Sequence, residues 1–281
     1  MNYKTDFKNF ICNSLFANYL FYFCKNLKIM KKIILLSMLF LGLISCSNDD
    51  SVDQNSILLK RMVQNAKDIN DNPQTNTLNI TYNGKKILEV NEPNFKIVYT
   101  YDGDFITKEV QYDSGNIYIT KEYTYENGKL KIFINNTQRN DGFTKTFYTS
   151  NNDGTVSYSN KNIVKNTLQE FQGKTGKLYF ENGNLVKDVS SNNADGSFPE
   201  TKIYEYDNKN NFLKNVIGFD KIYEYNKNNI LKNGNISYLI ENGVTTPITR
   251  YYDIYEYSYN ENNFPIEIRN IGGGSSQLFY E

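Results

Sequence analysis

The sequence contains no histidine and no tryptophan, and its three cysteines all lie within the first 46 residues, at Cys12, Cys24 and Cys46. Without histidine, the chain has no Ser-His-Asp arrangement, no Cys–His nucleophile pair and no ordinary zinc ligand set. No disulfide can form among the residues after Cys46, so packing alone must stabilise that part of the chain. The sequence therefore predicts no metal and no cofactor, and it favours a protein that is not an enzyme.

The chain also lacks an apolar run of the roughly 20 residues that a membrane-spanning helix needs. Residues 30–46, MKKIILLSMLFLGLISC, combine two lysines, a short apolar run and a small residue before Cys46, which is typical of a secretory signal. The ending LISC resembles the lipobox of bacterial lipoproteins, in which the cysteine is lipidated and becomes the first mature residue. This resemblance implies lipid attachment at Cys46 and contact with the membrane through that anchor. The alternative is an ordinary signal with a chance cysteine.

Four segments follow from this interpretation. Residues 1–29 are an upstream start or an extra N-terminal segment, 30–45 are the lipoprotein signal peptide, 46–56 are the lipidated cysteine with a polar tether, and 57–281 form a repeat domain. We expect translation to begin at Met30 rather than at Met1. The acidic stretch SNDD after Cys46 resembles export signals of surface lipoproteins, and the alternative is a plain spacer. We expect an outer-membrane lipoprotein on the periplasmic or the extracellular face.

Charge of one sign is not in excess, because the full chain has 31 basic and 31 acidic residues. Residues 1–45 carry six of the lysines and one acid, so the remainder has 25 basic and 30 acidic residues. A mildly acidic protein does not offer the basic patch that nucleic acid requires. We therefore expect no nucleic-acid partner.

Turn dipeptides are abundant. Asn-Gly and Asp-Gly tolerate the positive φ of tight hairpin turns, and here they separate stretches of alternating residues. They begin at Asn83, Asp102, Asn127, Asp141, Asp153, Asn182, Asp195, Asn233 and Asn242. The pattern predicts an all-β protein, an antiparallel meander of repeated hairpins in a single curled, barrel-like sheet. Residues 57–68 have helical spacing but no clear cap, so we expect a strand there as well.

One hairpin unit is written twice, as IYEYDNKNNFLKN at 203–215 and IYEYNKNNILKN at 222–233. We expect each copy to form its own hairpin. In each copy, and again near residue 255, two tyrosines one residue apart share a face of the strand. These tyrosines either pack in the core or form an aromatic platform for a ligand near an open end of the sheet. They are Tyr204, Tyr206, Tyr223, Tyr225, Tyr255 and Tyr257.

Acids at the matching repeat positions, Glu205, Glu224 and Glu256, offer paired carboxylates of the kind that glycoside hydrolases use. An acid that recurs in every repeat is more simply explained as part of a solvated sheet face. No other catalytic residues are predicted.

The phrases YTYDGDFITKE, YEYDNKNNFLKN and YEYSYNENNFPIEI resemble YD (Rhs-type) repeats, with Tyr-Asp or Tyr-Asn before a turn. Over residues 78–281 the chain is similar to a group of uncharacterised bacterial lipoproteins built from such units. That resemblance implies a porin-like, barrel-shaped antiparallel sheet and supplies no catalytic residues. The chain is too short for the enclosing shells of Rhs proteins.

Together these features predict a lipid-anchored extracytoplasmic protein, not an enzyme, that binds a glycan or an envelope protein or serves as an envelope accessory. Two alternatives stay open at this point. One is a polysaccharide hydrolase that uses carboxylates, and the other is a purely structural or assembly component.

Overall fold

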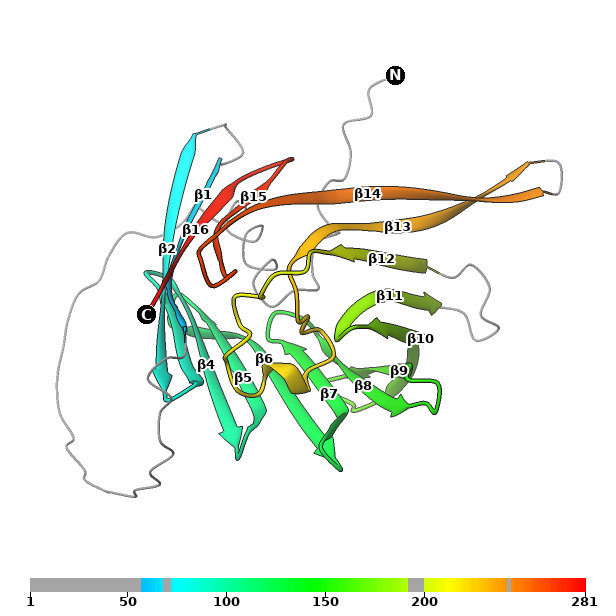
Figure 1. The fold of residues 1–281 in the computed structure, drawn as a ribbon. Coiled ribbons are helices and arrows are strands. Elements are labelled where there is room, and N and C mark those ends of the chain that lie inside the picture. The colour runs from blue at the N-terminus through cyan, green and yellow to red at the C-terminus, as the bar shows by residue number, and fades with distance from the viewer. Residues whose placement is uncertain (1–56, 68–71, 192–199, 242–243) are drawn as a thin grey trace.

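The computed structural model describes residues 57–67, 72–191, 200–241 and 244–281, and all their side chains except those of residues 237–246. Sixteen strands each pair antiparallel with the next along the chain, and β16 pairs with β1 to close a barrel (Figure 1). This confirms the all-β antiparallel meander in one barrel-like sheet. The strands are β1 (Leu59–Lys67), β2 (Pro73–Asn83), β3 (Lys86–Glu92), β4 (Phe95–Asp102), β5 (Phe105–Asp113), β6 (Asn116–Glu126), β7 (Lys129–Thr137), β8 (Gly142–Ser150), β9 (Val156–Val164), β10 (Glu170–Glu181), β11 (Asn184–Ser191), β12 (Glu200–Tyr206), β13 (Ile230–Glu241), β14 (Val244–Tyr259), β15 (Pro265–Asn270) and β16 (Ser275–Tyr280).

Five of the predicted turn dipeptides connect consecutive strands and have a glycine with positive φ, as tight turns require. These glycines are Gly84, Gly103, Gly128, Gly154 and Gly183. Because alternate connections of a meander lie at the same end, all five mark one end of the barrel, which we call the plug end. The opposite end is the far end.

Two other dipeptides do not make the predicted hairpin turn. Gly142 is already the first residue of β8. Asn233-Gly234 lies inside β13, at a register shift where the missing side chain lets the backbone approach Arg250 closely. The dipeptides at Asp195 and Asn242 include residues outside the described part of the chain.

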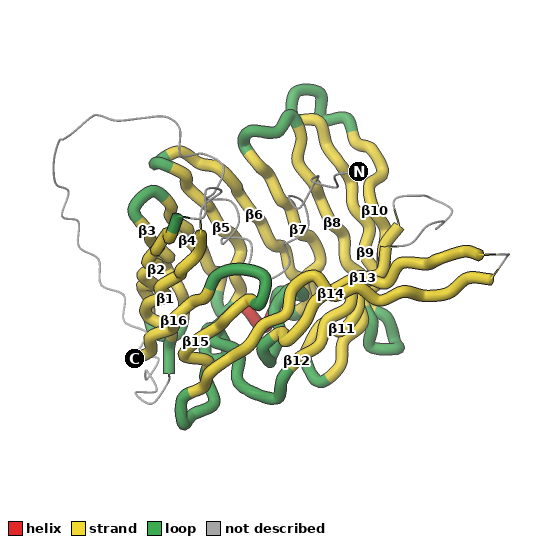
Figure 2. Tube along the Cα trace, turned by 90° about the horizontal axis from the view of Figure 1, so that it is seen from above, coloured by secondary structure: helices red, strands yellow, loops and turns green. Residues whose placement is uncertain are grey.

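The prediction of two separate repeat hairpins is wrong. Only the first half of copy one and the second half of copy two form strands, and they pair with each other, Glu205 opposite Lys232. The intervening residues 207–229, which we call the plug, contain a single 3-10 turn, η3 (Phe219–Lys221), and no strand. Figure 2 shows the plug inside the ring of strands.

The plug fills the barrel because a ring of this many strands is too wide for wall side chains alone to pack its interior. Phe219 is fully buried, and its ring meets that of Tyr99 on β4 edge-on at 5.6 Å. Tyr223 contacts Tyr148 on β8 at 5.0 Å and Phe180 on β10 at 5.9 Å between ring centroids. The core therefore lies between the plug and the inner wall.

The hairpin of β13 and β14 is longer than its neighbours and projects from the barrel (Figures 1 and 2). β12 reaches β13 only as far as Ile236, and β15 joins β14 only from Tyr255 onward. Beyond those points the described residues of the two strands are paired in the sheet only with each other, although the Ile254 carbonyl still accepts a hydrogen bond from the Ile271 N–H at 2.9 Å. No helix among the described residues is long and apolar enough to cross a membrane.

Candidate functional site

Two hydrogen-bonded residues, which we call the neck, lie where the plug joins the wall. Asp207 follows β12 and Asn229 precedes β13. The Asn229 backbone N–H donates to Asp207 Oδ1 at 3.1 Å, and Asn229 Nδ2 donates to Asp207 Oδ2 at 3.1 Å. The Asp207 N–H in turn donates to the Asn229 carbonyl at 3.0 Å. These bonds close the neck where a tight turn would otherwise join the two strands.

Further bonds tie the plug to the turns around the plug end. Asn228 and Asn184 exchange two hydrogen bonds of 3.0 Å, and the Lys227 N–H donates to the Gly183 carbonyl at 3.2 Å. On another side of the ring, the Ile217 N–H donates to the Lys85 carbonyl at 3.0 Å. Because these contacts reach turns from distant parts of the chain, they fix the plug across the end of the barrel.

Gly218 precedes η3 and has a φ of 94°, a conformation that glycine adopts without strain. A side chain here would also collide with the wall, because an added Cβ would lie 2.9 Å from Ile106 Cγ1. The turn of the plug against β5 therefore depends on glycine at this position.

A recurring tyrosine near the plug end links each of five even-numbered strands to the strand before it. In five cases its hydroxyl donates to a backbone carbonyl at 2.6 to 3.0 Å. The tyrosines are Tyr82, Tyr125, Tyr206, Tyr257 and Tyr280, and the acceptors are Leu59, Ile106, Leu185, Ile230 and Pro265, in the same order. The repeated tyrosine therefore has a structural role, because its ring packs inward and its hydroxyl satisfies a carbonyl.

The structure separates the six tyrosines predicted from the sequence. Those at 204, 206, 255 and 257 lie on β12 and β14, where they face the lumen, and those at 223 and 225 lie on the plug. Burial raises the pKa of the Tyr225 hydroxyl to about 12. The six do not form one exposed platform, and two of them belong to the structural series above.

The inner wall changes from apolar to polar toward the far end. Along β5, buried Ile106 near the plug end is followed on the same face by Glu109 and Gln111, which are also buried. Other strands show the same change. Inward polar residues on them are Gln64, Thr146, Asp188, Ser190, Asp253 and Ser276. This part of the interior, which we call the polar half of the lumen, lies beyond the apolar core.

Charged pairs line the wall of the polar half. Lys121 Nζ on β6 lies 3.0 Å from Glu109 Oε1 on β5, and both side chains are largely buried. Lys174 Nζ on β10 lies 2.7 Å from Glu200 Oε2 on β12, and these side chains keep exposures of 39% and 27%. Solvent therefore reaches the wall of the lumen more freely nearer the far end.

Tyr158 adds a third buried contact, because its hydroxyl donates to Asp188 Oδ1 at 2.9 Å. Burial raises the pKa of Asp188, and the hydrogen bond from Tyr158 opposes that rise. The ring of Tyr158 lies directly over Gly176, where any side chain would collide with it. The tyrosine is thereby held in place at the boundary between the apolar core and the polar half.

Several acceptor atoms on this inner wall are covered and receive no hydrogen bond from the described residues. They are Glu109 Oε2, Asn135 Oδ1, Asn160 Oδ1 and Asp253 Oδ2. Buried polar atoms normally have a partner, so these atoms call for donors supplied by water or by a bound molecule.

The three repeat carboxylates do not come together. Glu205 and Glu256 face outward and form ion pairs with Lys232 and Arg269. Glu224 lies on the plug inside the barrel, where burial raises its pKa, Glu109 raises it further and Lys121 lowers it. Catalysis by this set of acids is not supported by their placement.

The outer wall carries charged residues at mid-strand. Lys108 on β5 lies 3.8 Å from Glu122 on β6, and Lys96 on β4 lies 3.7 Å from Glu89 on β3. These pairs are exposed, so they add little to stability. Their importance is that they occupy the face that would have to be apolar if lipid surrounded the barrel.

Sequence reasoning missed the plug, although one signal was present. Phe212, Leu213, Val216, Ile217 and Phe219 bring more apolar residues between the two tyrosine pairs than a short turn needs. No group of three or more His, Cys, Asp or Glu side chains in the described residues is placed to hold a metal ion. Cys46 and the predicted signal and tether lie outside the described residues.

No protein-family model matches the chain, and no curated protein matches it. Among solved structures, it is similar to a porin-like protein from Bacteroides vulgatus, with 14% identity and a TM-score of 0.51 over 80% of this chain and 99% of that one. A porin-like protein from Bacteroides uniformis has 10% identity and a TM-score of 0.49, over 80% and 96% of the two chains. The likeness to the first protein concerns the fold alone. The barrel-shaped sheet is confirmed, whereas the YD-repeat and lipoprotein parts of the resemblance stay predictions.

Proposed function

We propose that the protein is a lipid-anchored envelope protein that binds a hydroxyl-rich ligand, a glycan, in the polar half of its lumen and does not conduct solutes. One observation carries this proposal. Residues 207–229 fill the barrel at the plug end, while the inner wall beyond them is polar and carries charged side chains that stay partly exposed, Lys174 and Glu200. A filled end favours holding a ligand over passing it through.

The outer wall supports attachment by lipid rather than insertion of the barrel. A membrane-spanning barrel needs an outward apolar band about 25 Å tall. Here charged pairs such as Lys108–Glu122 and Lys232–Glu205 interrupt the outer face. Acylation of Cys46 would then supply the membrane contact, on either the periplasmic or the extracellular face of the outer membrane.

The entry point of the chain supports an orientation. The Leu58 N–H pairs with the Glu281 carbonyl beside the plug end, so the chain enters the barrel there. The tether of 46–56 reaches at most about 40 Å when fully extended. The plug end is therefore kept near the membrane, and the polar half can open away from it.

Two measurements on the full lipoprotein and on residues 47–281 test the proposal. Fatty-acid labelling should mark the parent and fail to mark Cys46→Ser. In planar bilayers or liposomes neither form should produce ion conductance. Steady conductance by the parent would overturn the non-conducting role.

A glycan array with residues 47–281 tests ligand capture. Lys202 on β12 lies opposite the inward Asp188 of β11, and its charge lowers the pKa of Asp188. Lys202→Met therefore changes the lumen wall, and Lys108→Met is the matched control on the outer wall. We expect a glycan that the parent and the control bind and that the lumen variant binds at least tenfold more weakly. Equal loss in both variants, or no bound glycan, would contradict lumenal capture.

An assembly role is the second candidate, and the projecting β13–β14 hairpin favours it. Its backbone edges lack neighbouring strands within the described residues, so a partner could add a strand there. Deleting residues 238–247 should then abolish recovery of an envelope complex and leave any glycan binding unchanged.

A further inference from the structure

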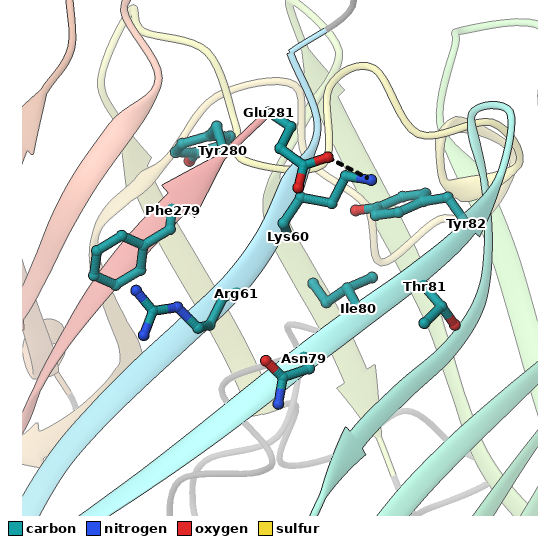
Figure 3. Close-up of a pocket in the computed structure, with 9 residues that line it drawn as sticks. All are labelled: Lys60, Arg61, Asn79, Ile80, Thr81, Tyr82, Phe279, Tyr280 and Glu281. Carbon is teal, nitrogen blue, oxygen red and sulfur yellow. Dashed lines mark ion pairs between the residues drawn. The ribbon is translucent and has the colours of Figure 1, made fainter.

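An open depression lies on the seam where β16, β1 and β2 meet, away from the polar half of the lumen. We call it the seam depression, and Figure 3 shows the side chains around it. It encloses about 600 Å³. Its outward rim carries Arg61, Asn79, Thr81 and Phe279, and its other side carries Lys60 and Glu281.

Arg61 is the charged centre of the seam depression. Its direct cross-strand neighbours are Phe279 and Asn79, neither of which carries a charge. Its guanidinium carbon lies 3.9 Å from the centre of the Phe279 ring. Figure 3 shows the guanidinium group pointing toward that ring. No acid among the described residues pairs with it. By contrast, Arg269 on β15 faces Glu256 across its ladder and forms an ion pair with it.

The contact with the ring orients the guanidinium without using its hydrogen-bond donors. A guanidinium that packs on an aromatic ring keeps N–H groups on its edge, and two parallel ones match a carboxylate. Asn79 and Thr81 follow on the same outward face of β2 and provide an amide and a hydroxyl. Phe279, 39% exposed, leaves apolar ring surface beside them.

The other two charged side chains of the depression pair with each other. Lys60 Nζ lies 3.1 Å from Glu281 Oε2 and also lies over the Tyr82 ring at 5.1 Å. This pair occupies the side chains of Lys60 and Glu281, so Arg61 is the charged side chain of the depression that has no ion-pair partner among the described residues. One positive charge suits a single carboxylate better than a phosphate dianion, which would need a second cation.

From this arrangement we infer that the seam depression binds the carboxylate of an acidic sugar, a uronic acid residue. Arg61 would hold the carboxylate bidentately, Asn79 and Thr81 would bond ring hydroxyls, and Phe279 would pack against the apolar face of the sugar. The site lies on the outer wall and is separate from the lumenal site of the proposed function. Either can therefore fail without the other.

The test uses residues 47–281 with a uronic acid trisaccharide and its neutral counterpart as probes, in calorimetric or NMR titrations. The parent should bind the acidic probe, and the neutral probe should bind at least tenfold more weakly. Arg61→Ala should abolish that preference, and Arg61→Lys should lose most of it, because a lysine cannot form the bidentate pair. Phe279→Ala should weaken binding of both probes.

Arg250→Ala is the matched control, because Arg250 is an exposed arginine on β14 without a described ion-pair partner. This variant should bind like the parent, and thermal unfolding should show that all variants fold. Equal affinity for the two probes, or equal loss in the Arg61 and Arg250 variants, would overturn the inference. So would binding to vesicles of anionic phospholipid that depends on Arg61 in the absence of any affinity for the acidic sugar.

Discussion

The two copies of the repeat differ by one inserted residue, Asp207, and by Phe212 in place of Ile230, yet they adopt opposite structures. In copy one the IYEY half is a strand and the FLKN half belongs to the plug. In copy two the IYEY half belongs to the plug and the ILKN half is a strand. Local sequence therefore does not decide between wall and interior. Which half of each copy lies in the wall depends on the whole barrel, because part of the chain must pack in its centre.

Cross-linking the paired strands is the most direct test of the opposite structures of the two copies. Residues 47–281 contain no cysteine, so engineered pairs are the only thiols. Glu205→Cys with Lys232→Cys should form a disulfide almost completely on oxidation, because these residues are direct cross-strand partners. Glu205→Cys with Lys214→Cys joins the equivalent positions within copy one and should not react. Mass spectrometry distinguishes the two, and the reverse result would show that each copy forms its own hairpin.

Removing the first isoleucine of each copy should have unequal effects on stability. Ile222 is 5% exposed in the core, so Ile222→Ala should lower the free energy of unfolding by about 2–5 kcal/mol. Ile203 faces outward and is only half-buried, so Ile203→Ala should cost about 1 kcal/mol or less. Urea unfolding of residues 47–281 measures both, and equal losses would contradict the different placement.

The second tyrosine of each copy gives a finer comparison. The Tyr206 hydroxyl donates to the Leu185 carbonyl at 2.6 Å, so Tyr206→Phe should lower the free energy of unfolding by about 1 kcal/mol. The Tyr225 hydroxyl makes no hydrogen bond to the described residues, and Tyr225→Phe should change stability by less than about 0.5 kcal/mol. Both substitutions keep the ring, so urea unfolding isolates the hydroxyl. A larger loss at Tyr225 would refute the assignment.

The acids of the two copies should titrate in opposite directions, with the smallest effects on stability. Burial raises the pKa of Glu224, so its contribution is present at low pH and is lost as the pH rises through the raised value. Hydrogen bonds from Tyr251 and Lys232 lower the pKa of Glu205, so its contribution is lost as the pH falls.

Unfolding free energies between about pH 3 and pH 8 check this prediction, because the contribution of Glu205 is lost below the ordinary glutamate pKa of about 4.3. Glu224→Gln should remove a decline of stability with rising pH. Glu205→Gln should remove a weak rise, because that side chain is exposed. Slopes of the same sign for the two acids would count against a buried Glu224 on the plug and an outward Glu205 on the wall.

The sequence was sufficient to predict the strands of the barrel wall, but not the segment that fills the interior. Turn dipeptides with period-two alternation predicted the meander, because these signals act within a few residues. Glycine also showed the limit of that reasoning, since Gly234 serves a bulge within β13 rather than a turn. Closure of the sheet depends on strand pairing between the two ends of the domain, which no local pattern contains.

The candidate site was predicted only in part. The tyrosines were recognised as core or platform, but the hydroxyl bonds from Tyr206 to Leu185 and from Tyr257 to Ile230 depend on pairs far apart in sequence. Whether an inward residue lies in the apolar core or in the polar half depends on its height, that is, its distance along the strand from the plug end. That height requires the register of the whole sheet, which alternation in single strands does not give.

The closing contact between β1 and β16 has a consequence for how the chain is made. Leu58 and Glu281 exchange backbone hydrogen bonds of 2.9 and 3.0 Å. The first strand can therefore complete its pairing only when the last strand has been synthesised. Contacts this distant slow folding, and until they form the two unpaired edges can recruit other chains. A chain whose sheet has not yet closed therefore exposes two strand edges, and a chain that lacks either terminal strand keeps an edge unpaired.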